Sequence, residues 1–275
     1  MILSYVFLEK KILYQKDKIS IITSTYNRGH LITKSINSVL TQTYKNIELL
    51  IIDDNSNDDT KKVIDSFRDK RIRYIKLRKK KGAAFARYLG IKKSIGEYIS
   101  FQDSDDICHI NKIEIQLKNL LINKSDLNFC KMKVHYSQRY KLIIPSFYQE
   151  RGFLKNGILN ELSNGNFIGT PSILVKKSVI EKFLFDINLP ALEDYDLMIR
   201  MASKINISFT NQILYEAYNQ NSSITTNAKK QKKANEMMLN KTYEFDSNHR
   251  KIFINKCISN IKYYERNIIK NSLYK

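Results

Sequence analysis

The sequence predicts an α/β protein whose mostly parallel, Rossmann-like sheet is flanked by helices, with a helical appendage at the C-terminus. Three observations support this class. Short apolar runs alternate with longer amphipathic ones from residue 19 to about 102, which is typical of βαβ units. The 275 residues are 43% apolar, enough to bury a core of that size. From residue 227 onward the chain is strongly basic and has no Gly or Pro, as expected of helices.

The predicted elements follow in order along the chain. Four apolar runs rich in β-branched or aromatic residues are the predicted strands: 19–23, 47–53, 72–77 and 97–101. The segments between them carry helical spacing: 30–42, 59–68 and 83–94. Further on we expect a helix at 109–122, a strand at 126–136, and a loop leading into a strand and a helix at 166–180.

The segment 227–275 is predicted to be a basic helical tail. It holds 12 Lys or Arg and 4 Asp or Glu, a net charge of +8. Its apolar residues recur at near-helical spacing, which predicts a basic amphipathic helix: Ile254, Ile258, Ile261, Ile268 and Leu273. Such a helix could rest on an anionic lipid surface or pack its apolar face on the rest of the chain, and both interpretations stay open.

Charge and cysteine content restrict the partners and the compartment. A net charge of +20 predicts an acidic partner: nucleic acid, an anionic lipid surface or a phosphate-bearing substrate. Three cysteines without CxxC spacing indicate a reducing compartment and no disulfide or zinc framework. The N-terminus has no small-residue cleavage site, and no apolar run reaches the roughly 20 residues that span a bilayer. We therefore expect a cytoplasmic protein.

Acidic residues follow two of the predicted strands. Asp53 and Asp54 end the 47–53 strand, and the sequence DSDD at 103–106 follows the 97–101 strand. Ligands of parallel sheets bind at the carboxyl ends of the strands, so both clusters should face one crevice. Asp103 and Asp105 can converge on one point and hold Mg²⁺ or Mn²⁺ together with substrate phosphates. The alternative is an Asp-rich turn, with Asp106 capping the next helix.

Two further segments could carry chemistry. In KGAAFARYLG, Gly82 and Arg87 at a helix start suit a diphosphate, although the segment could equally be a solvated basic face. In LEDYDLMIR, Glu193 and Asp194 could include a general base, or could only stabilise the helix dipole. The absence of GxGxxG and GxxxxGK[ST] argues against a dinucleotide oxidoreductase and a P-loop enzyme.

Taken together, these segments resemble the family 2 glycosyltransferases, which are inverting enzymes with the GT-A fold. The resemblance covers about residues 18–225, through ISIITSTYNR, ELLIIDDNSNDDT, KGAAFARYLG, GEYISFQDSDD, NFIGTPSILVKK and LEDYDLMIR, in that order. It implies metal-dependent transfer of a sugar from a nucleotide-diphosphate sugar, such as a UDP-sugar, to a glycan or lipid-linked glycan in bacterial surface polysaccharide synthesis. It also implies a place in the cytoplasm, with peripheral binding to the plasma membrane through the tail.

The resemblance also assigns roles to matching residues. It implies that Asp54 binds the base, that Arg87 approaches the base or the phosphates, and that Ser24, Thr25, Tyr26 and Ser104 contact the nucleotide sugar. Asp103 and Asp105 match the DxD pair that holds Mn²⁺ or Mg²⁺, with Asp105 as the direct ligand. Asp194 matches the catalytic base, and Glu193 beside it would contact the acceptor.

The resemblance also divides the chain and leaves alternatives. It implies an extension at 1–17, a catalytic domain at 18–226 with a nucleotide-binding half (18–106) and an acceptor half (107–226), and the tail at 227–275. Many relatives have a histidine where this chain has Asn219 or Gln220, so the way in which metal or diphosphate is held there is open. An inactive sugar-nucleotide-binding relative and a basic nucleic-acid-binding protein are the alternatives, although no RNA-binding motif is present.

Overall fold

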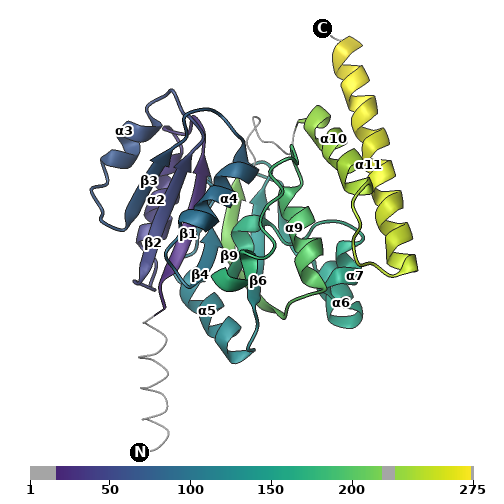
Figure 1. The fold of residues 1–275 in the computed structure, drawn as a ribbon, viewed down its shortest axis with the longest axis horizontal. Coiled ribbons are helices and arrows are strands. Elements are labelled where there is room, and N and C mark those ends of the chain that lie inside the picture. Colours follow the sequence, from purple (N-terminus) through teal and green to yellow (C-terminus); the bar gives the residue numbers. More distant parts are fainter. Residues whose placement is uncertain (1–16, 219–226, 274–275) are drawn as a thin grey trace, which may run out of the picture.

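The structure is a computed structural model that describes residues 17–218 and 227–273 (Figure 1). Within these residues nine strands form one sheet, with β7 paired beside β6 and the others in the order β3-β2-β1-β4-β8-β6-β9-β5. Apart from Asp17, the predicted extension at 1–17 lies outside the described residues, as do Asn219 and Gln220.

The first half of the sheet is parallel. It consists of β1 (Ile19–Thr25), β2 (Ile47–Asp53), β3 (Ile72–Lys76) and β4 (Tyr98–Phe101). The helices α2 (Ile32–Leu40), α3 (Thr60–Asp65) and α5 (Lys112–Ile122) share one buried cluster with this sheet, whereas α4 (Ala83–Lys93) contributes to clusters on the opposite face. Burial on both faces explains the nearly continuous Ile and Leu runs of β1 and β2.

A close contact fixes α4 on the sheet. Gly90 lies directly over Ile22 of β1, and a Cβ at this position would come 2.4 Å from Ile22 Cγ2. The backbone of α4 can therefore approach β1 closely, which brings the first turn of the helix to the carboxyl end of the sheet. Predicted bounds for these strands and helices agree with the structure to within a few residues.

The second half of the sheet is mixed. Its strands are β5 (Ile107–Cys108), β6 (Leu127–His135), β7 (Lys141–Ile144), β8 (Ile173–Lys176) and β9 (Ile207–Tyr218). β8 runs antiparallel to β4 and β6, β9 runs parallel to β6, and β5 and β7 pair antiparallel with β9 and β6. The parallel arrangement expected from the sequence is thus concentrated in β3-β2-β1-β4, and the α/β fold class is confirmed.

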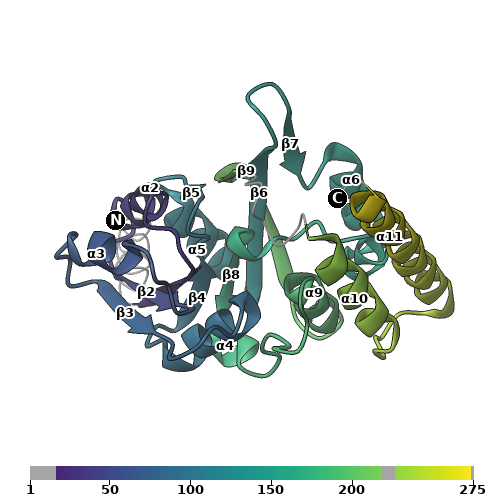
Figure 2. The ribbon, with the colours of Figure 1, turned by 90° about the horizontal axis from the view of Figure 1, so that it is seen from above.

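The helices of this half are short. They are α6 (Phe147–Asn156), α7 (Ile158–Leu162), the 3-10 helix η1 (Thr170–Ser172), α8 (Lys177–Ile180) and α9 (Glu193–Ala202). In Figure 2 the hairpin of β6 and β7 stands out from the body of the fold, with α6 beside its base. α9 begins at the edge of the sheet where β1 and β4 end, so its first turn faces their carboxyl ends (Figure 1).

The C-terminal segment forms two helices that lie side by side, α10 (Ala228–Leu239) and α11 (Ser247–Leu273). Met238, Phe253 and Cys257 from this segment are buried in the same cluster as Tyr195 and Met198 of α9. The first half of α11 therefore packs an apolar face on the rest of the chain. Every helix within the described residues is too short or too polar to cross a bilayer.

Candidate active site

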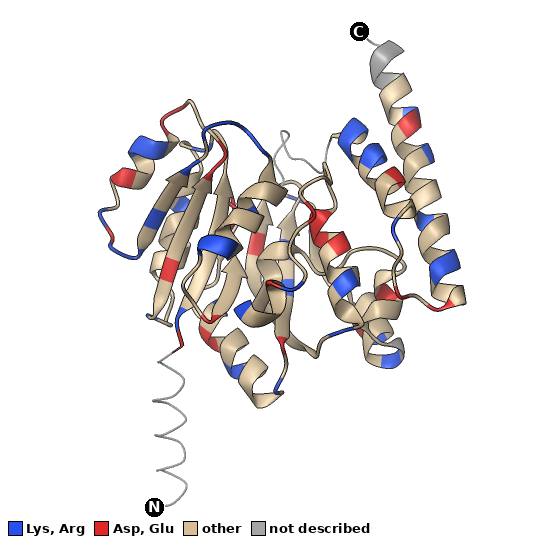
Figure 3. Cartoon of the chain, in the orientation of Figure 1, with Lys and Arg blue, Asp and Glu red and all other residues tan. Residues whose placement is uncertain are grey.

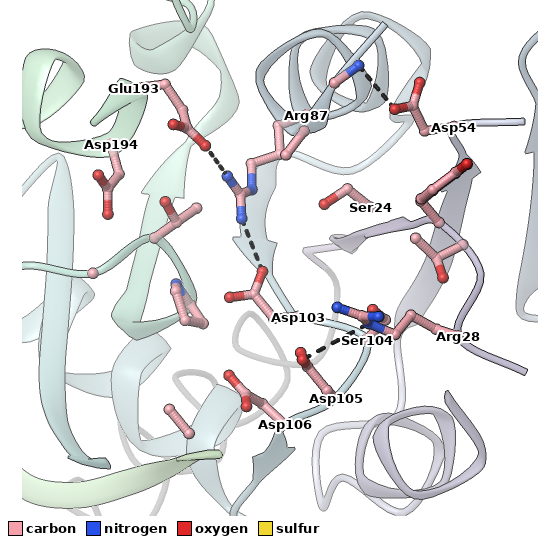
Figure 4. Close-up of a pocket in the computed structure, with 18 of the residues that line it drawn as sticks. Ser24, Arg28, Asp54, Arg87, Asp103, Ser104, Asp105, Asp106, Glu193 and Asp194 are labelled. Atoms are coloured by element: carbon pink, nitrogen blue, oxygen red, sulfur yellow. Dashed lines mark hydrogen bonds and ion pairs between the residues drawn. The ribbon is translucent and has the colours of Figure 1, made fainter. Parts of the chain in front are cut away.

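One pocket of about 610 Å³ lies at the carboxyl ends of β1, β2 and β4, opposite the first turn of α9 (Figure 4). Ten residues that the sequence singled out for the site line this pocket: Ser24, Thr25, Tyr26, Asp54, Arg87, Asp103, Ser104, Asp105, Glu193 and Asp194. Asp53, expected in the same crevice, is instead fully buried and accepts a hydrogen bond from Ser56 N. The structure thus brings together the acids at two strand ends and the acids of a helix about 90 residues further along the chain.

Arg87 lies at the centre of the site. Its Nη2 donates to Asp103 Oδ1 at 2.9 Å, and its Nη1 donates to Glu193 Oε1 at 2.6 Å (Figure 4). Burial alone would lower the pKa of this guanidinium, but Asp103 and Glu193 raise it above its usual value. Arg87 is therefore a fixed cation that joins the strand-end acids to the acids of α9.

The acids after β4 differ in their surroundings. Asp103 is anchored through its backbone N–H, which donates to Tyr215 Oη at 3.0 Å. Asp105 lies 3.9 Å from Arg28 Nε. Burial and the charge of Asp103 raise the pKa of Asp105, against the opposing effect of Arg28. This carboxylate is thus more costly to ionise than an isolated one, as expected where like charges converge.

Asp106 does not cap the following helix, and that interpretation is wrong. α5 begins at Lys112 with Asn111 before it, whereas Asp106 Oδ1 accepts a hydrogen bond from Tyr218 N at 2.8 Å. Burial and the charges of Asp103 and Asp105 raise the pKa of Asp106 well above its usual value. Asp106 lies too far from the helix to cap it, because residues 107 and 108 form the short strand β5 before α5 begins.

Glu193 and Asp194 open α9. Leu192 before them has φ 62° and ψ 19°, a left-handed conformation that is uncommon for Leu and that turns the chain into the helix at the pocket wall. Asp194 Oδ1 accepts a hydrogen bond from Tyr195 N at 2.7 Å. Burial, followed by the charge of Glu193, raises the pKa of Asp194 to about 6. A carboxylate with this pKa suits a general base near neutral pH.

The ends of β1 and β2 form the opposite wall. Asp54 accepts hydrogen bonds from the backbone N–H groups of Lys81 and Gly82 at 2.6 and 2.8 Å, one on each carboxylate oxygen. Each oxygen keeps a second lone pair for a ligand. Thr25 Oγ1 is buried and has no hydrogen-bond partner within the part of the chain that the structure describes. A buried hydroxyl that lacks a hydrogen-bond partner at a pocket wall can form a hydrogen bond with a polar ligand.

Several lining residues were missed by the sequence reasoning. Lys80, whose Nζ lies 3.4 Å from the centre of the Tyr26 ring, and Arg28 add cations near the strand ends. Lys230 and Gln231 come from the first turn of α10. Arg28 is the last residue of the quoted segment ISIITSTYNR and lies two residues after Tyr26, so its position in the sequence could have indicated a place in the site. Nothing in the local sequence signals that α10 reaches the pocket.

The acids offer part of a divalent-metal site. Within residues 17–218 and 227–273, no group of three His, Cys, Asp or Glu side chains forms a complete metal site. Asp103 and Asp105 nevertheless present hard oxygen ligands. Burial, followed by the charge of Asp103, raises the pKa of Asp105, and a bound cation would offset both effects. Mg²⁺ is commonly bound by one or two carboxylates, with substrate phosphates and water completing its shell. The residues fit such an ion.

Comparison with known proteins identifies relatives of the chain. A model of the family "Glycosyl transferase family 2" matches residues 20–184. The chain is 38% identical over 192 residues to an uncharacterized glycosyltransferase of Rickettsia felis, covering 69% of this chain but 31% of that protein. It is 34% identical over 193 residues to the Escherichia coli UDP-Glc:alpha-D-GlcNAc-diphosphoundecaprenol beta-1,3-glucosyltransferase WfgD, covering 70% of this chain and 73% of WfgD.

The fold also matches solved structures. S. aureus TarS 1–349, crystallised with UDP-GlcNAc, superposes with a TM-score of 0.68 at 20% identity, over 87% of this chain and 71% of TarS. The chain spans about a third of the length of the Rickettsia felis relative and about three quarters of WfgD.

Proposed function

The chain belongs to glycosyl transferase family 2, and we propose that it transfers a sugar from a UDP-sugar to a hydroxyl of a lipid-diphosphate-linked glycan, with inversion at the anomeric carbon. The observation that carries this proposal is the arrangement of the pocket. Asp194, whose pKa is raised to about 6, lines the same pocket as the strand-end acids Asp103 and Asp105, and Arg87 lies between the two groups.

The proposed chemistry is one displacement. The acceptor hydroxyl oxygen bonds to the anomeric carbon as the bond from that carbon to the diphosphate oxygen breaks, and Asp194 takes the hydroxyl proton. Attack from the face opposite the leaving group inverts the configuration. Asp194 is suited to this role because its raised pKa makes it a stronger base than an ordinary carboxylate.

The basic side chains around the pocket would bind the diphosphate. Arg28, Lys80 and Lys230 line it from three different elements or loops. We propose that Asp103 and Asp105 hold Mn²⁺ or Mg²⁺, with Asp105 as the direct ligand. When bound, the ion would act as a Lewis acid toward the leaving diphosphate. Arg87 would keep Asp103 in place and orient Glu193 at the acceptor side.

The proposed acceptor class rests on WfgD and on WfaP, a second Escherichia coli glucosyltransferase named for the same reaction and 32% identical to this chain over 208 residues. Both names specify a sugar on diphosphoundecaprenol as acceptor. We propose that this chain acts on a similar acceptor in surface polysaccharide synthesis, on the cytoplasmic face of the plasma membrane. The basic residues of α10 and α11, visible in Figure 3, would contribute to binding of that surface.

The test is transfer to a defined acceptor. The protein is incubated with each of a panel of nucleotide sugars and a synthetic GlcNAc-diphosphate-lipid, and the anomeric configuration of the product is read by NMR. We expect a β-linked product from a UDP-α-sugar, and no product from Asp194→Asn. Binding of the donor without transfer to any acceptor would favour the inactive sugar-nucleotide-binding alternative. Salt-dependent binding of oligonucleotides without donor binding would favour the nucleic-acid alternative.

A further inference from the structure

Exposed apolar side chains gather on one short stretch of the chain, residues 136–154. Tyr136 and Tyr140 flank the turn of the β6–β7 hairpin, and Leu142 and Ile143 lie on β7; all four are exposed. On α6, Phe147, Leu154 and Tyr148 are 65, 71 and 84% exposed. We call these seven residues, together with Arg139, Lys141, Arg151 and Lys155, the hairpin–helix surface.

The outer face of α6 is a continuous stripe. Its exposed residues lie within roughly 120° of the helix circumference at 3.6 residues per turn: Phe147, Tyr148, Arg151, Leu154 and Lys155. Phe153, which is 5% exposed, points the other way and packs on Phe129 of β6 and on Phe167. The helix therefore has its own core contact, and its apolar outer residues are not needed to hold it on the fold.

The same surface is basic. Residues 131–157 contain six Lys or Arg against a single Glu, a net charge of +5. This acid, Glu150, forms an ion pair of 2.8 Å with Lys131, so it does not offset the charges of the other Lys and Arg side chains. The Arg151 guanidinium lies 5.7 Å from the centre of the Phe147 ring. An aromatic and a basic side chain thus lie beside each other on the outer face of α6.

We propose that the hairpin–helix surface binds an anionic lipid bilayer. Exposed Tyr and Phe rings beside Lys and Arg are typical of helices that lie in the membrane interface, where the rings enter the headgroup region and the cations meet anionic lipids. An apolar patch of this kind is costly in water, which indicates that it has a partner. The four cations of the surface, a charge of +4, select a partner of negative charge, and the bilayer supplies both the charge and an apolar phase.

The location of the surface fits this partner. Met132 lines the active-site pocket and pairs with Ile144 at the base of the hairpin. The turn of the hairpin lies four residue pairs beyond the Met132–Ile144 pair, on the order of 10 Å along the strands. A bilayer on the hairpin–helix surface would therefore lie next to the acceptor side of the pocket. The proposal concerns a binding surface and can be tested without transferase activity, so its failure would leave the proposed reaction intact.

The experiment is flotation of the full chain with vesicles of phosphatidylcholine, with or without phosphatidylglycerol. We expect the protein to float with the phosphatidylglycerol vesicles. The triple variant Phe147→Ser, Tyr148→Ser, Leu154→Ser should partition at least roughly tenfold more weakly. The quadruple variant Arg139→Gln, Lys141→Gln, Arg151→Gln, Lys155→Gln should weaken the preference for phosphatidylglycerol, with the basic residues of α10 and α11 responsible for what remains.

Matched controls use exposed residues elsewhere. Ile95, Ile122 and Ile187 are 58, 65 and 46% exposed, and their triple change to Ser should leave partitioning unchanged. A second control tests the loss of charge. It changes four exposed lysines to Gln and should leave the preference for phosphatidylglycerol unchanged: Lys92, Lys93, Lys118 and Lys124. Melting curves by circular dichroism check that each variant is folded. Partitioning that is equal in the two triple variants, or absent in the unaltered chain, overturns the proposal. So does a finding by size-exclusion chromatography that the surface joins two copies of the chain.

Discussion

Arg87 and Glu193 lie 106 residues apart in the chain, and their side chains form an ion pair of 2.6 Å. The pair joins the N-terminal half of α4 to the first turn of α9, and these two helices carry the two sides of the pocket. With Asp103 as the second partner of Arg87, one guanidinium determines the distance between the strand-end acids and the acids of α9. The geometry of the site therefore depends on a single buried cation.

Loss of that cation should destabilise the fold. Arg87→Met keeps most of the side-chain volume but leaves Asp103 and Glu193 without their partner in a site where Arg87 is 11% exposed. Removing one partner of a buried pair typically costs about 3–5 kcal/mol. We expect the free energy of unfolding at pH 7 to fall by about 3 kcal/mol, measured by urea denaturation, and transfer activity to be lost.

A surface pair provides the control. Arg71 forms a 2.8 Å ion pair with Asp69, and its side chain is 25% exposed. Arg71→Met should lower the free energy of unfolding by less than about 1 kcal/mol, as is usual for solvated pairs. If both variants lost the same amount, Arg87 would not have the central role that its contacts indicate.

Transfer should depend on pH through Asp194. The carboxylate form is the base, and burial and Glu193 raise the pKa of Asp194 to about 6. We therefore expect the rate constant for transfer to rise as pH increases through about 6 and to level off above it. Asp194→Asn should lower kcat by about three orders of magnitude or more, within the range of general-base loss, with donor affinity unchanged by calorimetry. A profile that is flat from pH 5 to 8 would contradict the assignment.

The same raised pKa predicts an effect on stability. Between its ordinary value and about 6, the folded protein binds the Asp194 proton more tightly than the unfolded chain, so stability falls as pH rises through this range. Asp194→Asn removes that loss. At pH 7 the variant should be more stable than the unaltered chain by about 1–3 kcal/mol, and the difference should vanish near pH 4. Asp65→Asn, at a side chain of α3 that is 53% exposed, serves as the control for removing an acid from the surface.

Removal of divalent ions tests the role of Asp105. We expect EDTA to abolish transfer and added Mn²⁺ or Mg²⁺ to restore it, because two carboxylates and a diphosphate otherwise repel each other in one pocket. Asp105→Asn should raise the metal concentration needed for half-maximal rate by about tenfold or more. Asp65→Asn again serves as the control, because it removes an acid from the surface. It should leave the metal concentration for half-maximal rate unchanged. Full activity in EDTA would remove the metal from the mechanism.

The strand-end half of the site was predictable from sequence for a physical reason. The carboxyl ends of parallel strands meet at one edge of a sheet, so Asp54 and Asp103 had to lie near each other once β2 and β4 were recognised. The place of Asp194 in the pocket could not be predicted in this way. Its position depends on the left-handed turn at Leu192 and on the packing of α9, which no local pattern signals. The residues alone offered Asp194 only as one of two possible bases, and the family resemblance selected it.

Lys230 was beyond prediction because it reaches the pocket through the packing of two distant helices. It lines the pocket from α10, whereas Lys229 beside it does not. Lys230→Gln should therefore weaken donor binding by about tenfold, the loss of roughly 1.4 kcal/mol, with kcat changed little. Lys229→Gln should leave the dissociation constant of the donor unchanged. Equal effects of the two variants would indicate only a general charge effect of α10.

The C-terminal segment is linked to α9 through Asp196. Asp196 of α9 is fully buried and accepts hydrogen bonds from Arg200 Nε at 2.9 Å, Lys241 Nζ at 2.7 Å and Tyr243 Oη at 2.8 Å. Lys241 and Tyr243 lie between α10 and α11. The C-terminal segment thus neutralises and hydrogen-bonds an acid two residues from the proposed base.

Tyr243→Phe removes one hydrogen bond to this buried carboxylate without changing the ring. Because hydrogen bonds to charged groups contribute about 1.5–3 kcal/mol, the free energy of unfolding should fall by about 2 kcal/mol. Tyr263→Phe on α11, where the ring is 61% exposed, should cost almost nothing. Both are measured by urea denaturation. We expect kcat to fall as well in Tyr243→Phe, because Asp196 holds the turn of α9 that carries Asp194. A variant that loses stability but keeps full activity would separate the C-terminal segment from the active site.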